Sequence, residues 1–185
     1  SGTVTGTLPT GDTARGIGGI AGSLTTNGAA VKTLTNSAAV TGNRSVGGIA
    51  GYFSGKDQAT GKDMSGCKNE GLILSSTAAD DHSLAGHYIG GIVGYGEQSV
   101  LYDCETEANG YVLGSEYVGG IIGENKGGST IKNCVNTGVV AGYNVFIGGI
   151  CGANENNAAI INCASYVSDT NNAIYRRVTD WGAVG

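Results

Sequence analysis

One short glycine string returns along the chain at a nearly fixed interval, and this repeat limits the fold more than any other feature. The string is Gly-Gly-Ile-x-Gly, and its copies begin at Gly18, Gly47, Gly90, Gly119 and Gly148. Successive copies therefore start 29, 43, 29 and 29 residues apart, and a degenerate sixth copy occupies residues 181–185. Self-similarity at such a short period indicates structural units that stack on one another.

A second block, Asn-Cys-x-Asn-Thr-Gly-x-Val-x-Gly, keeps the same phase and is clearest over residues 133–142. A period of 29 is too short for a propeller blade, and the leucine pattern of leucine-rich repeats is missing. Helical repeats are excluded because 35 of the 185 residues are glycine, and each would cost about 1 kcal/mol inside a helix. We predict an all-β parallel β-solenoid (β-helix) of about five to six coils, with a 29-residue repeat and about three short strands per coil.

Stacking in register would place equivalent residues of successive coils into columns. One predicted core column contains Ile20, Ile49, Ile92, Ile121 and Ile150. A second contains Ile17, Val46, Ile89, Val118 and Ile147, with Trp181 at its end. The glycine pair between the two columns predicts a corner, where either a Cβ atom would clash or φ is positive.

The chain is predicted to form one module over residues 1–185, and because its pattern starts and stops within a unit, we expect a segment of a longer protein. Departures from the period predict insertions near residues 52–62, 75–87 and 169–179, and insertions in repeat proteins usually form loops. A formal net charge of −5 argues against a nucleic-acid partner, which needs clustered Lys and Arg. Residues 134–154 carry no charge but contain five glycines and three asparagines. This favours buried strands and no membrane insertion.

The Val/Ile-Gly-Gly-Ile-x-Gly strings and the Asn-Cys-x-Asn-Thr-Gly block resemble the GLUG repeat family, over nearly the whole chain. The resemblance implies a β-solenoid module of a secreted or cell-surface bacterial protein. The family includes adhesin-like surface proteins and non-catalytic regions of some immunoglobulin A peptidases, and it has no catalytic motif to carry over. The last unit departs most from the pattern, since Trp181 replaces an aliphatic residue.

The cysteines occupy apolar positions of the repeat. Four of them share one column, namely Cys67, Cys104, Cys134 and Cys163, and Leu34 holds that position in the first full unit. Cys151 aligns with aliphatic residues. No Cys-x-x-Cys spacing suggests zinc, so we expect buried free thiols. Disulfides and a metal site are the alternatives.

Three polar patterns are interpreted as scaffold or surface. The string at residues 16–21 approximates a dinucleotide fingerprint but lacks the βαβ context, so no cofactor is expected. His82 and His87, with Asp80 and Asp81 nearby, could bind a metal, but a solvated loop explains them and no metal is expected.

Asp103, Glu105 and Glu107 alternate, so on a strand they would share one face. Carboxylate clusters occur in polysaccharide-cleaving β-helices, but no second carboxylate group stacks on this one. We expect an outward face, a Lys68–Glu105 pair and no catalytic residues.

Aromatic residues also recur in phase. Tyr88, Tyr117 and Phe146 share one position, Tyr52 and Tyr95 share another, and Phe53 lies beside Tyr52. These six residues form the candidate binding surface, because exposed rings can contact sugars or anchor a protein partner. The alternative is packing between coils that stiffens the rod.

The sequence thus predicts a non-enzymatic, extracellular or cell-surface bacterial module. It would act as an adhesin-like stalk or as a binding scaffold for host or matrix ligands, with a protein or a glycan as the ligand. Two alternatives stay open. One is a subunit that stacks end to end into a filament, because exposed strand edges template pairing. The other is a substrate-recognition or accessory segment of a large surface peptidase or polysaccharide-active enzyme.

Overall fold

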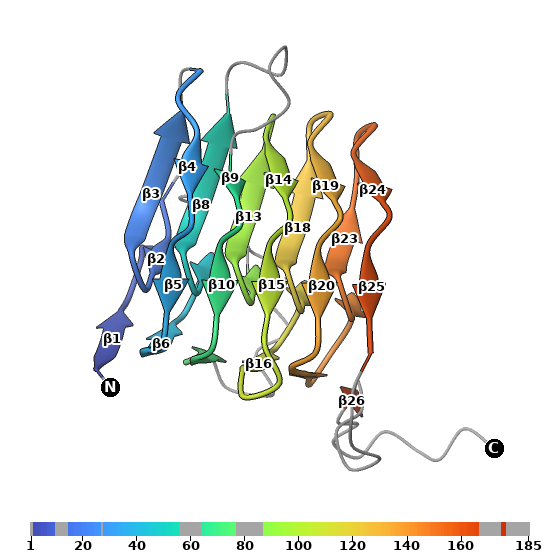
Figure 1. Ribbon diagram of the computed structural model, residues 1–185. Coiled ribbons are helices and arrows are strands. Elements are labelled where there is room, and N and C mark those ends of the chain that lie inside the picture. The colour runs from blue at the N-terminus through green and yellow to red at the C-terminus, as the bar shows by residue number, and fades with distance from the viewer. Residues whose placement is uncertain are drawn as a thin grey trace, which may run out of the picture.

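The computed structural model describes residues 2–9, 15–26, 28–55, 64–76, 87–166 and 175–176. Within these ranges the chain forms 26 short strands and no helix, arranged as stacked coils (Figure 1). All strand pairs are parallel and fall into five sheets. The predicted parallel β-solenoid is therefore confirmed.

The sheets are named A to E, and each contains one strand from every coil. Sheet A contains β1 (Thr3–Gly6), β6 (Ala39–Gly42), β11 (Leu72–Ser75), β16 (Tyr111–Gly114), β21 (Val139–Gly142) and β26 (Tyr175–Arg176). Sheet B contains β2 (Ile17–Gly18), β7 (Val46–Gly47), β12 (Ile89–Gly90), β17 (Val118–Gly119) and β22 (Ile147–Gly148). Sheet C contains β3 (Ala21–Thr26), β8 (Ala50–Gly55), β13 (Val93–Glu97), β18 (Ile122–Lys126) and β23 (Cys151–Asn154). Sheet D contains β4 (Val31–Lys32), β9 (Met64–Ser65), β14 (Val100–Tyr102), β19 (Thr130–Lys132) and β24 (Ala159–Ile161). Sheet E contains β5 (Thr35–Asn36), β10 (Lys68–Asn69), β15 (Glu105–Thr106), β20 (Val135–Asn136) and β25 (Ala164–Ser165).

Each coil passes through the sheets in the order B, C, D, E, A, so coil 1 runs from β2 to β6 and coil 5 from β22 to β26. Five strands per coil replace the three that were predicted, and that number was wrong. Most strands are only two to six residues long, because glycine bends and left-handed residues interrupt the extended backbone at each corner.

Strand pairing places the predicted columns in register. In sheet B, Val46 pairs with Ile89, and Val118 pairs with both Ile89 and Ile147. Two clusters of buried side chains fill each coil. One contains Ile49, Ile92 and Ile121, and the other contains Val46, Ile89 and Val118. The two predicted core columns thus belong to separate clusters. At the first coil Ile20 is 50% exposed, and Trp181 lies outside the described residues.

The glycine pairs stand where there is no room for a side chain. A Cβ atom on Gly47 or Gly48 would lie closer than 3.0 Å to backbone atoms of the same or the next coil. Neither glycine has a positive φ. Of the two reasons predicted for these corners, close approach of the backbone is therefore the one that applies.

Left-handed residues form a separate corner between sheets D and E. Positive φ values between 51° and 61° occur there at one equivalent position of every coil, at Thr33, Gly66, Asp103, Asn133 and Asn162. Gly, Asn and Asp are the residue types that adopt this conformation most readily. The column turns the chain between the two sheets without a helix.

The predicted insertions are only partly described. Residues 52–55, expected in the first insertion, belong to β8, and Ser75 of the second belongs to β11. Residues 56–63 and 77–86 lie outside the described part. Of the third insertion, near residues 169–179, only Tyr175–Arg176 is described, and it is a strand rather than a loop.

All five cysteines are free thiols, as expected. Cys67, Cys104 and Cys134 are buried, and Cys151 and Cys163 are half-buried. The amide of Cys104 donates to Sγ of Cys134 at 3.4 Å, so the sulfur atoms follow the stacking direction. In the described ranges no helix has the length and hydrophobicity needed to cross a membrane.

Candidate functional site

Five aromatic rings from four coils contact one another in a continuous row, three from residues that immediately precede the strands of sheet B and two from strands of sheet C. The ring centroids of Tyr52 and Tyr95 are 5.7 Å apart, and those of Tyr95 and Tyr88 are 4.9 Å apart. Tyr117 continues the row at 5.2 Å from Tyr88, and Phe146 follows at 4.7 Å from Tyr117. We call these five residues the aromatic array. The structure therefore joins the two aromatic columns that the sequence showed separately.

Most ring faces in the aromatic array are turned toward another ring. The interplanar angle is 11° for Tyr52 and Tyr95 and 15° for Tyr117 and Phe146, so both pairs are stacked. Tyr88 joins the pairs with tilted contacts of 53° and 60°. Such contacts between coils add about 0.5–1.5 kcal/mol per pair. Phe146 is 48% exposed, whereas Tyr95 is buried, so the expectation that Tyr95 belongs to an exposed surface was wrong.

Phe53 does not belong to this surface, and its placement there was wrong. Its side chain is fully buried in the cluster that contains Met64 and Leu101. Neighbouring residues of a strand point to opposite sides, so Phe53 faces inward where Tyr52 faces outward. In the next coil Phe53 pairs with Gly96, where a Cβ atom would collide with the side chain of Ile122.

Charged side chains adjoin the aromatic array and were not singled out by sequence reasoning. The hydroxyl of Tyr52 donates to Oε2 of Glu97 at 3.2 Å. Nζ of Lys126 lies 3.3 Å from Oε1 of Glu124 and 3.6 Å from Oε2 of Glu155. We call Glu97, Glu124, Lys126 and Glu155 the acid–lysine cluster. The sequence signal was the alternation Glu124-x-Lys126 at the repeat position of Tyr95-x-Glu97.

Burial raises the pKa values of several acidic groups in and beside the aromatic array. Glu124 is 2% exposed, and burial raises the pKa of its carboxyl group above the ordinary value of 4.5, while Lys126 opposes the shift. Burial also raises the pKa values of the Tyr88 and Tyr95 hydroxyl groups, with nearby carboxylates acting in the same direction. Both phenols therefore stay protonated at neutral pH and can donate hydrogen bonds.

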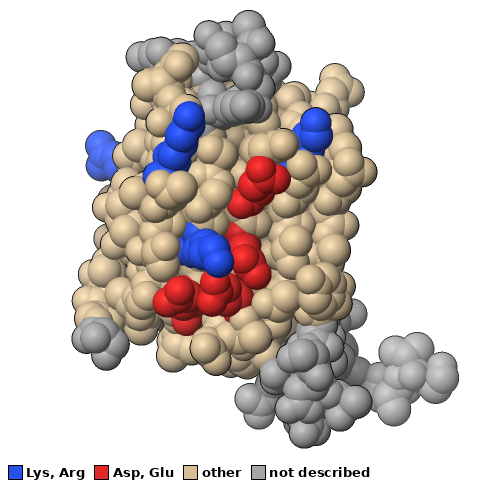
Figure 2. Space-filling view, viewed as in Figure 1, with Lys and Arg blue, Asp and Glu red and all other residues tan. Residues whose placement is uncertain are grey.

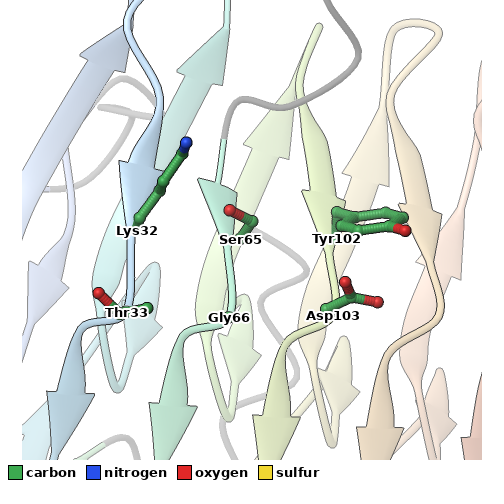
Figure 3. A pocket seen from close by; sticks show the side chains of 6 residues that line it. All are labelled: Lys32, Thr33, Ser65, Gly66, Tyr102 and Asp103. Carbon is green, nitrogen blue, oxygen red and sulfur yellow. The ribbon is translucent and has the colours of Figure 1, made fainter.

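A second surface feature lies at the corner between sheets D and E. It is a shallow cavity of about 210 Å³ (Figure 3), lined by Lys32, Thr33, Ser65, Gly66, Tyr102 and Asp103. We call it the coil-2 notch, because Ser65 and Gly66 of coil 2 lie between the larger residues of coils 1 and 3. Its lining combines polar groups with apolar surface, and the residues come from three consecutive coils. Sequence reasoning did not find it.

An acidic group beside Lys68 lies on sheet E, and Figure 2 shows charged side chains gathered on this face. Nζ of Lys68 is 3.3 Å from Oε2 of Glu105 and 2.8 Å from Oε1 of Glu107. The predicted Lys68–Glu105 pair is confirmed, and because the lysine is exposed, solvent screens the pair and keeps its contribution to stability small. Asp103 does not join them, because it occupies the left-handed corner with φ at 54° and lines the coil-2 notch.

Only one of the four residues that could bind a metal, His87, lies in the described part of the chain. Asp80, Asp81 and His82 lie outside the described residues, and His87 is buried. Among the residues that the structure places, no three His, Cys, Asp or Glu side chains converge as a metal site would require.

Stacked coils with equivalent columns define a repeat protein of the β-solenoid class. Comparison with protein families identifies the repeat, because residues 114–146 match the family described as the GLUG motif. This match spans coil 4 from the end of β16 to the residue before β22, so the motif corresponds to one turn of the solenoid. No curated protein and no solved structure matches the chain.

Proposed function

We propose that the chain is a non-enzymatic repeat module of a secreted or cell-surface bacterial protein, and that it acts as a stiff stalk and binding scaffold. The observation that carries this proposal is the continuity of the five sheets. In each sheet every coil is hydrogen-bonded to the next in register, and the columns of buried residues run with them. A rod built this way resists bending and holds its lateral surface in fixed geometry.

The aromatic array and the acid–lysine cluster together support a binding role for one side of the rod. They combine ring edges and phenol donors with the carboxylates of Glu97 and Glu155 and the ammonium of Lys126. Aromatic and polar groups in fixed positions are typical of surfaces that contact proteins or glycans. The exposed ring of Phe146 is the most accessible apolar contact in the aromatic array.

The test is binding of the folded module to arrayed glycans and to purified matrix proteins such as collagen and fibronectin. The variant Tyr117→Ala/Phe146→Ala removes the accessible end of the aromatic array and should weaken binding at least about tenfold, which is equivalent to the ~1.4 kcal/mol of a modest hot spot. The control Tyr166→Ala removes a 58% exposed ring outside the array and should bind like the unaltered module. If the Tyr117→Ala/Phe146→Ala variant binds as well as the Tyr166→Ala control, the aromatic array is not the binding surface. If the unaltered module binds none of the ligands, only the stalk function remains.

A further inference from the structure

The coil-2 notch exists because small residues of one coil lie between large residues of its neighbours. Ser65 pairs with Lys32 of coil 1 and with Tyr102 of coil 3. At the next position Gly66 lies between Thr33 of coil 1 and Asp103 of coil 3. Two coil steps separate the flanking walls, which places them roughly 9.6 Å apart at a spacing of ~4.8 Å per coil. A six-membered ring fits in such a gap.

The base of the notch is held rigidly by the backbone. The amide of Thr33 donates to the carbonyl of Ser65 at 3.0 Å, that of Gly66 to Tyr102 at 3.0 Å, and that of Asp103 to Lys132 at 3.1 Å. These donors are therefore occupied, and recognition of a ligand falls to the side chains.

The side chains around the notch differ in hydrogen-bonding character. Lys32 only donates, Asp103 only accepts when ionised, and the hydroxyls of Thr33 and Ser65 do both. In the described part of the chain neither Lys32 nor Asp103 has an ion-pair partner, whereas Lys68 is paired with Glu105 and Glu107. Figure 3 shows the Lys32 ammonium extending toward coil 2 and the Asp103 carboxylate on the opposite side of Gly66.

Tyr102 lines the coil-2 notch on its coil-3 side, and its ring extends toward coil 4 (Figure 3). Nζ of Lys132 lies 5.8 Å from the centre of its ring, on the side away from the notch in the coil order. This contact holds the ring in place from coil 4.

We propose that the coil-2 notch is a binding site for one neutral sugar ring of a glycan. Sugar hydroxyls both donate and accept, which matches the mixed lining, and the opposite charges of Lys32 and Asp103 favour a ligand without net charge. A volume of about 210 Å³ is below the ~300–1,000 Å³ of pockets for drug-sized ligands, so the notch accommodates one ring and leaves the rest of the glycan outside. The site is at a different corner from the aromatic array and does not depend on it.

The test is a ¹⁵N–¹H NMR titration of the module with the methyl glycosides of glucose, galactose, mannose and N-acetylglucosamine. A small open site should bind at least one of them with a dissociation constant on the order of 1–10 mM. The amides of Ser65, Gly66 and Asp103 should shift, and those of the aromatic array should not. Absence of a shift at these amides with all four glycosides, at roughly ten times that concentration, would overturn the proposal. So would a shift caused by N-acetylated tripeptides but by no glycoside.

Two variants test the site without disturbing the fold. Ser65→Tyr/Gly66→Asn fills the notch with residue types that the same columns already hold at Tyr102 and Asn133, and it should reduce affinity at least about tenfold. Asp103→Asn keeps the left-handed corner but removes the carboxylate, and it should weaken binding about five- to tenfold. The control Asn133→Gly changes the same column outside the notch and should bind normally. Unchanged affinity in the first two variants would refute the site. Both variants keep the aromatic array intact, so this result can be distinguished from a failure of the proposed scaffold function.

Discussion

The side-chain amide of Asn36 donates a hydrogen bond to Oδ1 of Asn69 in the adjacent coil, at a distance of 2.8 Å. Both residues are buried, and each also closes the turn that follows it. Nδ2 of Asn69 donates to the carbonyl of Gly71, and the amide of Gly71 donates to Oδ1 of Asn69. Asn136 repeats this arrangement with Gly138 in coil 4. The asparagine column therefore shapes a turn in coils 1, 2 and 4, and Asn36 and Asn69 connect coils 1 and 2.

Replacement of Asn69 with alanine should destabilise the module markedly. It leaves the amide of Asn36 and the backbone amide of Gly71 without their acceptor, and a buried unsatisfied group costs about 1–3 kcal/mol. We expect the free energy of unfolding in urea to fall by at least about 2 kcal/mol. Ser37→Ala is the control, because it removes an exposed hydrogen bond to Glu70 and should change stability by under about 0.5 kcal/mol. Equal losses in the two variants would contradict the role of the column.

Replacement of Gly48 with alanine should be still more damaging. The new Cβ atom would lie against the carbonyl oxygen of Gly91 and Oδ1 of Asn69, closer than real Cβ contacts allow. Because backbone atoms cannot move aside cheaply, the expected cost is about 3 kcal/mol or more, at or beyond the upper end of overpacking effects. The control Gly2→Ala meets nothing within 4 Å and should be neutral. Thermal denaturation followed by circular dichroism compares the two.

The columns of the solenoid could be predicted because stacking makes residues one repeat apart equivalent. Ile49, Ile92 and Ile121 are fully buried, as the shared position of their glycine strings indicated. The inward position of Phe53 was also readable, since it follows outward-facing Tyr52 on one strand. The interpretation that failed was the assignment of the adjacent residues Tyr52 and Phe53 to the same surface.

Other features depend on geometry that a repeat pattern does not contain. The five strands per coil follow from corners at left-handed residues such as Asp103 and Asn133, and these were interpreted only as polar positions. The contact between Tyr88 and Tyr95 joins different positions of the repeat, so alignment of copies could not show it. The coil-2 notch depends on Ser65 and Gly66 being smaller than their neighbours in adjacent coils, which requires knowledge of the stacking register.

The thiols should resist alkylation in the native state. The most accessible are Cys151 and Cys163, and burial raises the pKa of Cys151 to about 12 and that of Cys163 above its ordinary value. Since the thiolate is the reactive species, we expect labelling by iodoacetamide at pH 8 to be at least about 100-fold slower than in urea. Mass spectrometry should count no adducts in the short native reaction and five adducts after unfolding without a reductant. Three adducts in urea would instead reveal a disulfide.

The buried carboxyl group of Glu124 should make stability depend on pH. Its native pKa is raised above 4.5 by burial, so between the two values the native state binds more protons than the unfolded state, and stability falls as pH rises through this window. Glu124→Gln lacks the titrating group. The unfolding free energy of the unaltered module relative to this variant should therefore increase as pH is lowered from 7 toward 5, by at most about 1.4 kcal/mol per pH unit.

Lys126→Met supplies the contrasting variant for the same measurement. The ammonium of Lys126 lies 3.3 Å from Glu124 and lowers the pKa of that carboxyl group, against the effect of burial. Its removal should move the pH-dependent window to higher pH, whereas Glu124→Gln abolishes the window. Urea unfolding at pH 5, 6 and 7 distinguishes the three proteins. Parallel pH profiles for all three would show that Glu124 titrates alike in the native and unfolded states, which its nearly complete burial beside Tyr88 argues against.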